Sequence, residues 1–202
     1  MGVRRLGPEE RREQILSAAI CHFAEVGLTG TTRDVAARAG VTQALLYRYF
    51  ASKAELLEAV FQRVFLGRLD PRWQEAIRDR GVPLRERLVR FYAAYTAAIF
   101  TPEWMRIFVW AGLAGEALNR RYFERLGETL LAPLREEVAA EPGLAPPDME
   151  AMWGLHGQVV YLGIRRFIYR LPTPDDPGPA IARAVDGFLA TLTLPTRSSL
   201  PP

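Results

Sequence analysis

The chain has 202 residues, of which 49% are hydrophobic and 24% charged, a composition that is ordinary for a globular protein. It contains no apolar run of the length that spans a bilayer, and its basic start lacks the apolar core of a signal peptide. A single cysteine, Cys21, excludes an internal disulfide and is typical of a reducing compartment. We therefore expect a soluble cytoplasmic protein without a membrane partner.

Positive charge is concentrated at the N-terminal end. Residues 1–53 contain eight basic and five acidic side chains, a net of +3, whereas the remaining 18 basic and 18 acidic side chains balance. Lys53 is the only lysine of the chain, since every other basic residue is arginine. The asymmetry indicates an anionic partner for this end, although an excess of three charges also arises by chance.

The first two predicted helices carry start and stop signals. Pro8 opens the first helix, two glutamates follow in its first turn, and Gly27 closes it. Thr31 is placed as the N-cap of a second, short helix that ends at Gly40.

A third predicted helix follows after a short turn. It begins after Thr42 and runs to Phe50, and Ser52 with Glu55 forms the capping box of a fourth helix. Two helices joined by a short turn that contains glycine are typical of a helix-turn-helix motif.

The side chains of the third helix separate into two arcs when successive residues are turned by about 100°. The first arc carries an amide, a methyl, a phenol and a guanidinium, from Gln43, Ala44, Tyr47 and Arg48. The opposite arc is apolar and aromatic, with Leu45, Leu46, Tyr49 and Phe50. The first set contains the groups that contact base edges and phosphates. Lys53 lies at the start of the next helix, where backbone N–H groups also favour phosphate.

The stretch GTTRDVAARAGVTQALLYRYFASKAELL resembles the DNA-binding segment of the tetracycline-repressor (TetR/AcrR-like) family of bacterial regulators. The resemblance extends over about residues 10–57, and Leu45 departs from the small residue often found at its position. It implies that the third helix enters the major groove of DNA. It also implies phosphate contacts from Thr42, Tyr47 and Lys53, base contacts from Gln43, Ala44 and Arg48, and a contribution from Arg33. With the cap residue Thr31, the predicted DNA-binding residues are Thr31, Arg33, Thr42, Gln43, Ala44, Tyr47, Arg48 and Lys53.

Each of these features also has an ordinary structural explanation. Tyr49 is expected in the core, a single arginine such as Arg48 is most often solvated, and capping boxes do no more than start helices. Their coincidence in one helix-turn-helix, with the arcs correctly sorted, favours DNA binding over a purely structural motif.

The rest of the chain is also predicted to be helical. The expected helices are 83–100, 102–113, 118–141 with a kink at Pro133, 149–171, and a last one that carries Ile181 to Leu192. We therefore predict an all-α protein with a three-helix helix-turn-helix DNA-binding domain at 1–53. A helical effector-binding and dimerisation domain is expected at 54–194, followed by a disordered tail at 195–202.

The helix predicted at 149–171 is apolar on two sides and so needs two covering surfaces. A partner subunit supplies one, and a two-fold dimer suits a palindromic DNA site; the alternative is that the domain core surrounds the helix. The resemblance favours a homodimer built by the last two helices. We also expect a small, mostly apolar effector near Trp104, Phe108, Trp153 and His156, although aromatic residues at helical spacing usually form core.

Enzymatic chemistry finds little support in the sequence. The only histidines are His22 and His156, and there is no HExxH motif, metal-spaced cysteine cluster, Walker loop or dinucleotide-binding glycine pattern. Cys21 and His22 are adjacent on a helix, so their side chains diverge. We expect no catalytic residue, metal or cofactor, and predict a DNA-binding repressor that its effector releases. The alternatives are a helical interaction module without DNA binding and, less favoured, an enzyme for small molecules.

Overall fold

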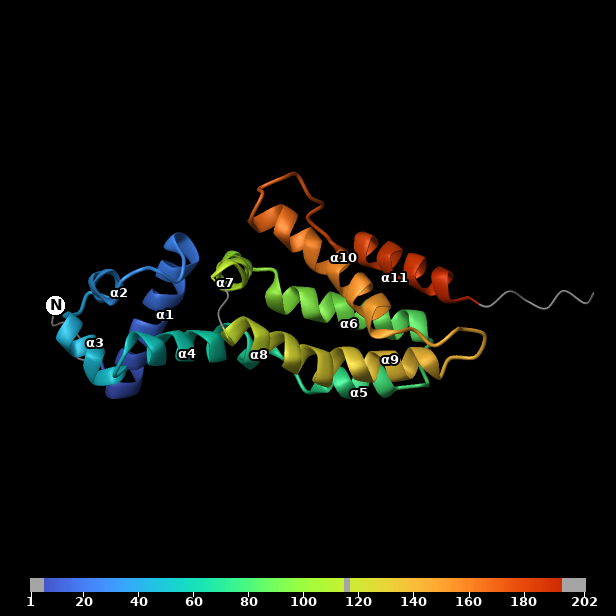
Figure 1. Ribbon diagram of the computed structural model, residues 1–202, viewed down its shortest axis with the longest axis horizontal. Helices are drawn as coiled ribbons and strands as arrows, with labels where there is room; N and C mark the ends of the chain where they lie inside the picture. The colour runs from blue at the N-terminus through green and yellow to red at the C-terminus, as the bar shows by residue number, and fades with distance from the viewer. Residues whose placement is uncertain (1–5, 115–116, 194–202) are drawn as a thin grey trace, which may run out of the picture. The chain divides into compact units, whose positions relative to one another are not determined.

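The computed structural model describes residues 6–114 and 117–193, and its regular secondary structure in this range is helical, apart from an isolated bridge between Leu144 and Thr193 (Figure 1). The helices are α1 (Pro8–Val26), α2 (Thr32–Arg38), α3 (Gln43–Tyr49), α4 (Lys53–Val64), η1 (Leu66–Arg68), α5 (Arg72–Arg78), α6 (Leu84–Ile99), α7 (Pro102–Leu113), α8 (Ala117–Leu126), a π-helical turn (Gly127–Leu131), α9 (Ala132–Ala139), α10 (Met149–Phe167) and α11 (Gly178–Leu192). The predicted all-α class is confirmed. The tail expected at 195–202 lies outside the described residues. Across the described ranges, no helix combines the length and hydrophobicity that crossing a membrane requires.

The chain divides into two compact units. The first contains residues 1–69 and 99–122, with α1 to α4 and α7, and the second contains residues 70–98 and 123–202, with α5, α9, α10 and α11. This division does not follow the boundary expected after residue 53, because α4 and α7 both pack against α1. The buried face of α1, which includes Ile15, Ala19 and Phe23, supplies the apolar surface for this packing.

The cap signals of the first unit act as expected. The hydroxyl oxygens of Thr31, Thr42 and Ser52 accept hydrogen bonds from backbone N–H groups three residues on, at 3.1–3.2 Å. The capping box predicted for Ser52 and Glu55 differs in its second hydrogen bond. The Glu55 carboxylate accepts from the N–H of Ala51, the residue before Ser52, at 2.7 Å. These local bonds set the starts of α2, α3 and α4, and hence the helix-turn-helix.

The end of α1 is shaped by a close contact with α7. Gly27 has a φ of +85°, a conformation that favours glycine, and a Cβ there would lie 3.1 Å from the Trp110 ring. The absence of a side chain therefore allows the indole to approach the end of α1.

The second unit departs from the predicted helices in three places. The sequence pattern predicted no helix at α5. One helix was expected over 118–141 with a kink at Pro133, but the irregularity is the π-helical turn before that residue, and Pro133 lies in the first turn of α9, where proline is tolerated. The side-chain amide of Gln74 donates to the Thr129 carbonyl at 2.8 Å, so α5 supports this turn. The helix expected over 149–171 ends earlier, at Phe167.

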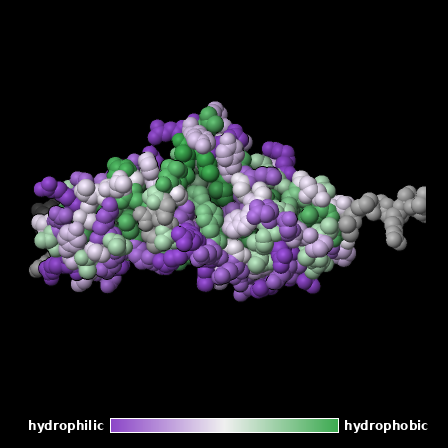
Figure 2. All heavy atoms as spheres, in the orientation of Figure 1, coloured by the Kyte–Doolittle hydropathy of each residue, from purple (hydrophilic) through white to green (hydrophobic). Residues whose placement is uncertain are grey.

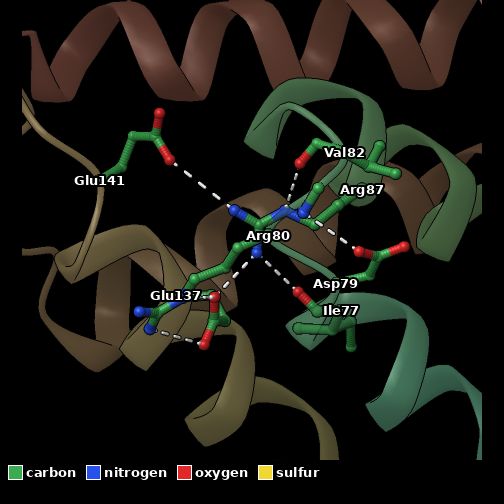
Figure 3. Close-up of polar contacts among 8 residues, drawn as sticks. Ile77, Asp79, Arg80, Val82, Arg87, Glu137 and Glu141 are labelled. Atoms are coloured by element: carbon green, nitrogen blue, oxygen red, sulfur yellow. Dashed lines mark hydrogen bonds and ion pairs between the residues drawn. The ribbon is translucent and has the colours of Figure 1, made fainter.

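A buried arginine, Arg87, connects three segments of the second unit (Figure 3). Its Nε donates to the Val82 carbonyl at 3.0 Å, and its Nη1 donates to the Ile77 carbonyl at 2.7 Å and to Glu137 at 2.8 Å. Arg80 holds the same carboxylate through two bonds of 3.0 and 3.1 Å. The hydrogen bond from Arg80 is the largest influence lowering the pKa of Glu137; burial opposes it, and Arg87 adds to the lowering. One guanidinium therefore joins the end of α5, the loop before α6, and α9.

Arg87→Met should lower the free energy of unfolding by about 3–5 kcal/mol, because the carbonyls of Ile77 and Val82 lose their side-chain donor and the buried Glu137 carboxylate loses one of its two arginine partners. Arg90→Met on the same helix is the matched control, since Arg90 is 64% exposed and pairs with an exposed Glu86. Its cost should be about 1 kcal/mol or less. Urea unfolding at pH 7 measures both, and equal losses would contradict the structural role of Arg87.

The same network implies an acid-sensitive contribution to stability. Because the pKa of Glu137 is held below its usual 4.5, the ionised carboxylate stabilises the fold above that pH, and the contribution is lost as the pH falls through the lowered pKa. Glu137→Gln should weaken this dependence in unfolding titrations below about pH 4.5.

Candidate nucleic-acid interface

The outward face of α3 is the arc that the sequence predicted. Its members Gln43, Ala44, Tyr47 and Arg48 are all exposed, whereas Leu46 and Phe50 are fully buried and Leu45 and Tyr49 are half-buried. Sorting by helical period is therefore confirmed for this helix.

Burial of its inner arc determines how α3 is turned. The helix has seven residues, too few to be stable in isolation, so its orientation depends on packing. Leu46 and Phe50 provide the buried anchors, and the guanidinium of Arg12 on α1 lies 4.8 Å from the centre of the Phe50 ring. Because the anchors fix the rotation of the helix, its polar arc projects as a unit.

A hydroxyl of α2 contacts two side chains of this arc. Thr32 Oγ1 accepts a hydrogen bond from Gln43 Nε2 at 3.0 Å and lies 3.0 Å from Tyr47 Oη. Thr32 itself is 6% exposed. Thr32 was not among the residues predicted from the sequence, because only its neighbour Thr31 carries a recognisable cap signal.

The other predicted contact residues surround this arc. Thr31 and Thr42 are exposed and act as N-caps, and Thr31 also donates to Asp34 Oδ2 at 2.6 Å. Arg33 is exposed on α2. Lys53 is half-buried at the start of α4, with its ammonium 5.9 Å from the centre of the Phe23 ring.

Ion pairing separates the basic residues of the first unit into two groups. Arg38 binds Glu25, with one bond of 2.7 Å, and Arg63 binds Glu13. The hydrogen bond from Arg38 lowers the pKa of the Glu25 carboxyl. Within residues 6–114 and 117–193, no acidic side chain forms an ion pair with Arg33, Arg48 or Lys53. Positive charge without an acidic partner among the described residues is thus present on the exposed arc, at Arg48, and beside it, at Arg33 and Lys53.

The residues predicted to bind an effector fall into different compact units. Trp104 and Phe108 belong to the first, where their rings stack 4.9 Å apart and Trp104 is buried against Phe65. Trp153 and His156 belong to the second, with ring centroids 5.8 Å apart. Each pair is therefore brought together within its own unit.

His156 is a buried histidine in an aromatic environment. Burial lowers its pKa to about 4, so the ring is neutral at physiological pH. Its Nε2 lies 3.5 Å from Tyr95 Oη, while its Nδ1 has no hydrogen-bond partner among the described residues. The hydroxyl of Tyr92, whose pKa burial raises, is also without a partner in that part of the chain. Unpartnered buried polar atoms are uncommon and call for an explanation.

No group of histidine, cysteine and acidic side chains within the described ranges is arranged to hold a metal ion. The geometry instead offers an exposed, positively charged arc in the first unit and a buried aromatic cluster in the second.

Residues 15–60 match the family model described as "Bacterial regulatory proteins, tetR family". The chain is 37% identical over 91 residues to the HTH-type transcriptional repressor KstR2 of Mycolicibacterium smegmatis, a match that covers 45% of this chain and 44% of that protein. It is 47% identical over 60 residues to the HTH-type transcriptional activator FasR of the same organism, covering 29% of this chain and 27% of that protein. The chain thus spans less than half the length of these two curated relatives.

The likeness extends further in structure than in sequence. A crystal structure of a TetR-like transcriptional regulator from Rhodococcus sp. RHA1 superimposes with a TM-score of 0.68 at 23% identity, covering 92% of this chain and 97% of the other. At this level of identity the similarity shows the fold alone.

Proposed function

We infer that the chain, which belongs to the TetR family of helix-turn-helix transcriptional regulators, binds operator DNA through the exposed arc of α3. The observation that carries the proposal is the arc itself, where Gln43, Tyr47 and Arg48 project together and Arg48 has no acidic partner among the described residues. Because the members of this family are transcriptional regulators, membership also argues against the alternative that the chain is an enzyme. We propose repression as the mode of regulation, supported by the name of KstR2, although FasR is named as an activator.

We propose two kinds of DNA contact. Tyr47, Lys53 and Thr42 would bind phosphates, with Lys53 at the N-terminus of the 12-residue α4, where backbone N–H groups favour an anion. Gln43 and Arg48 would contact base edges, since amide and guanidinium groups form paired hydrogen bonds with purines. Ala44 would lie against the bases, and Arg33 and Thr31 would approach from α2.

We further propose a homodimer formed by α10 and α11, which pack against each other. Gly154 and Gly157 are exposed on α10, Gly187 is exposed on α11, and a Cβ at any of them would meet nothing within 4 Å. Glycine inside a helix costs about 1 kcal/mol relative to alanine, and close approach of a second copy would offset that cost. Tyr161 is 50% exposed on α10, and Figure 2 shows hydrophobic spheres over the C-terminal half of this helix. A two-fold dimer would match a palindromic operator.

For the effector, we propose an uncharged and mostly apolar molecule that binds in the second unit beside Trp153 and His156. The unpartnered atoms His156 Nδ1 and Tyr92 Oη support this, because each would gain a hydrogen bond from a small polar group on the ligand. The neutral state of His156 disfavours an anion that needs a charged partner. Trp104, which is buried, and Phe108, which is half-buried, belong to the first unit, so the proposal does not depend on them.

The DNA-binding proposal predicts different effects for two basic residues. Lys53→Ala should weaken binding similarly on specific and random duplexes and lower the slope of log affinity against log salt by about one unit. Arg48→Ala should instead relax the preference at particular base pairs by about 1–3 kcal/mol.

Fluorescence anisotropy with labelled duplexes at several salt concentrations measures both effects. Arg63→Ala is the control, because Arg63 also lies on α4 but is already paired with Glu13. A wild-type protein without salt-dependent duplex binding would instead favour an interaction module. A loss for Lys53→Ala on one sequence only would refute its phosphate role.

The dimer proposal predicts that Gly157→Arg dissociates the protein without unfolding it. A side chain has open space at this position in the single chain, but it would lie between the two copies. The dimer dissociation constant should rise by about thirtyfold or more, the effect of losing a major interface contact. Sedimentation measures this, and Ala139→Arg at an exposed position of α9 is the control. A dimer that persists in Gly157→Arg would place the interface elsewhere.

The effector proposal predicts reciprocal coupling with DNA. A true effector should quench the fluorescence of Trp153 and weaken DNA affinity, and operator DNA must weaken effector affinity by the same factor, typically about 5–150-fold. Trp153→Phe should remove the quench, whereas Trp110→Phe in the first unit should retain it. A compound that binds equally well with and without operator is not the effector.

A further inference from the structure

Two exposed side chains of α3 are joined by one buried hydroxyl of α2. Thr32 Oγ1 is 3.0 Å from both Gln43 Nε2 and Tyr47 Oη, although Thr32 is 6% exposed and Tyr47 is 42% exposed. Gln43 and Tyr47 are four residues apart and so lie on the same side of the helix. The three groups form a continuous polar chain that begins in the protein and ends at its surface.

We propose that Thr32 is a positioning residue for sequence recognition, holding Gln43 ready for a base and Tyr47 ready for a phosphate. This inference rests on the proposed binding of DNA by α3. Thr32 would not contact the DNA itself, because its hydroxyl is buried and occupied by its two partners.

The number of available hydrogen-bond donors determines the direction of this series of hydrogen bonds in the DNA complex. A threonine hydroxyl has one hydrogen to donate and two lone pairs to accept with, and Thr32 already accepts from the Gln43 amide. If Thr32 donates to Tyr47 Oη, the phenolic hydrogen of Tyr47 is left to point outward. A phosphate oxygen can only accept, so phosphate binding selects this direction. Hydrogen bonds aligned in one direction strengthen one another.

The same direction determines which way the Gln43 amide faces. Once the hydroxyl hydrogen of Thr32 is used on Tyr47, Thr32 can only accept, and the amide must turn its nitrogen toward it. One N–H and the Oε1 of Gln43 then remain available to bond a base in the major groove of the DNA. Adenine presents the matching pair, the N7 acceptor and the N6 donor. Gln43 is therefore set to select adenine at one position of each half-site.

Selection from a randomised duplex library with the full chain, followed by affinity measurements at one salt concentration, tests the role of Thr32. Thr32→Val keeps the shape of the side chain and removes the hydroxyl, and it should reduce the preference for adenine at one position by about tenfold, within the usual range for a paired base contact. Preferences due to Arg48 should remain. Thr32→Ser keeps the hydroxyl and should retain the adenine preference. Thr96→Val is the matched control, because Thr96 is also a buried threonine whose hydroxyl donates to a carbonyl of its own helix.

Tyr47→Phe tests the series of hydrogen bonds from its exposed end, where a substitution disturbs the fold least. Without the phenol oxygen, the Thr32 hydrogen is free to bond Gln43 Oε1, and the amide can turn over. The variant should lose the adenine preference at the same position in addition to affinity. A simple phosphate contact by Tyr47 would weaken all sequences equally.

The outcomes separate the inference from the proposal on which it rests. A wild-type protein that selects no sequence refutes DNA recognition by α3 and the inference with it. A wild-type protein that selects a sequence, with the same base preferences in Thr32→Val and Tyr47→Phe, refutes the positioning role alone. Thermal unfolding of each variant identifies losses caused by instability, and a loss of base preference in the stable Thr96→Val control would also overturn the role of Thr32.

Discussion

The proposed DNA-recognition surface depends on burying one side of a helix that is too short to be stable alone. With seven residues, α3 takes its geometry from the full burial of Leu46 and Phe50 and from the cap at Thr42. These anchors fix the rotation of the helix about its axis, so every polar side chain on the opposite arc faces outward together. The proposed contact with DNA would therefore rely on packing inside the first unit as much as on the contacting groups.

Arginine serves two physical purposes in this chain, and its neighbours decide which. Arg87 is buried, with each bond made to a carbonyl or carboxylate, and it holds α5, α6 and α9 together. Arg48 is exposed and has no acidic partner in the part of the chain that the structure describes. Because Lys53 is the only lysine, composition cannot separate the structural cations from those available to a partner.

The second unit carries features that cost free energy in a single chain. The buried atoms His156 Nδ1 and Tyr92 Oη have no partner among the described residues, and Gly154 and Gly157 weaken an exposed face of α10. A bound effector would compensate the first cost and a second subunit the other. In the proposed regulation, binding of an effector at one site would change the affinity of another site for DNA.

The sequence by itself determined the all-α class, the caps of α2, α3 and α4, and the two arcs of α3, because each depends on residues within a few positions of one another. It did not identify α5 or the π-helical turn, which depend on contacts such as that between Gln74 and Thr129, 55 residues apart. Tertiary packing also grouped α7 with α1, and it assigned Trp104 and His156 to different compact units. It brought Thr32 to Gln43 and Tyr47, 11 and 15 residues away, because the turn between α2 and α3 folds one helix onto the other. Local patterns are encoded by neighbouring side chains, whereas the partners of a buried polar group are decided only when the helices pack.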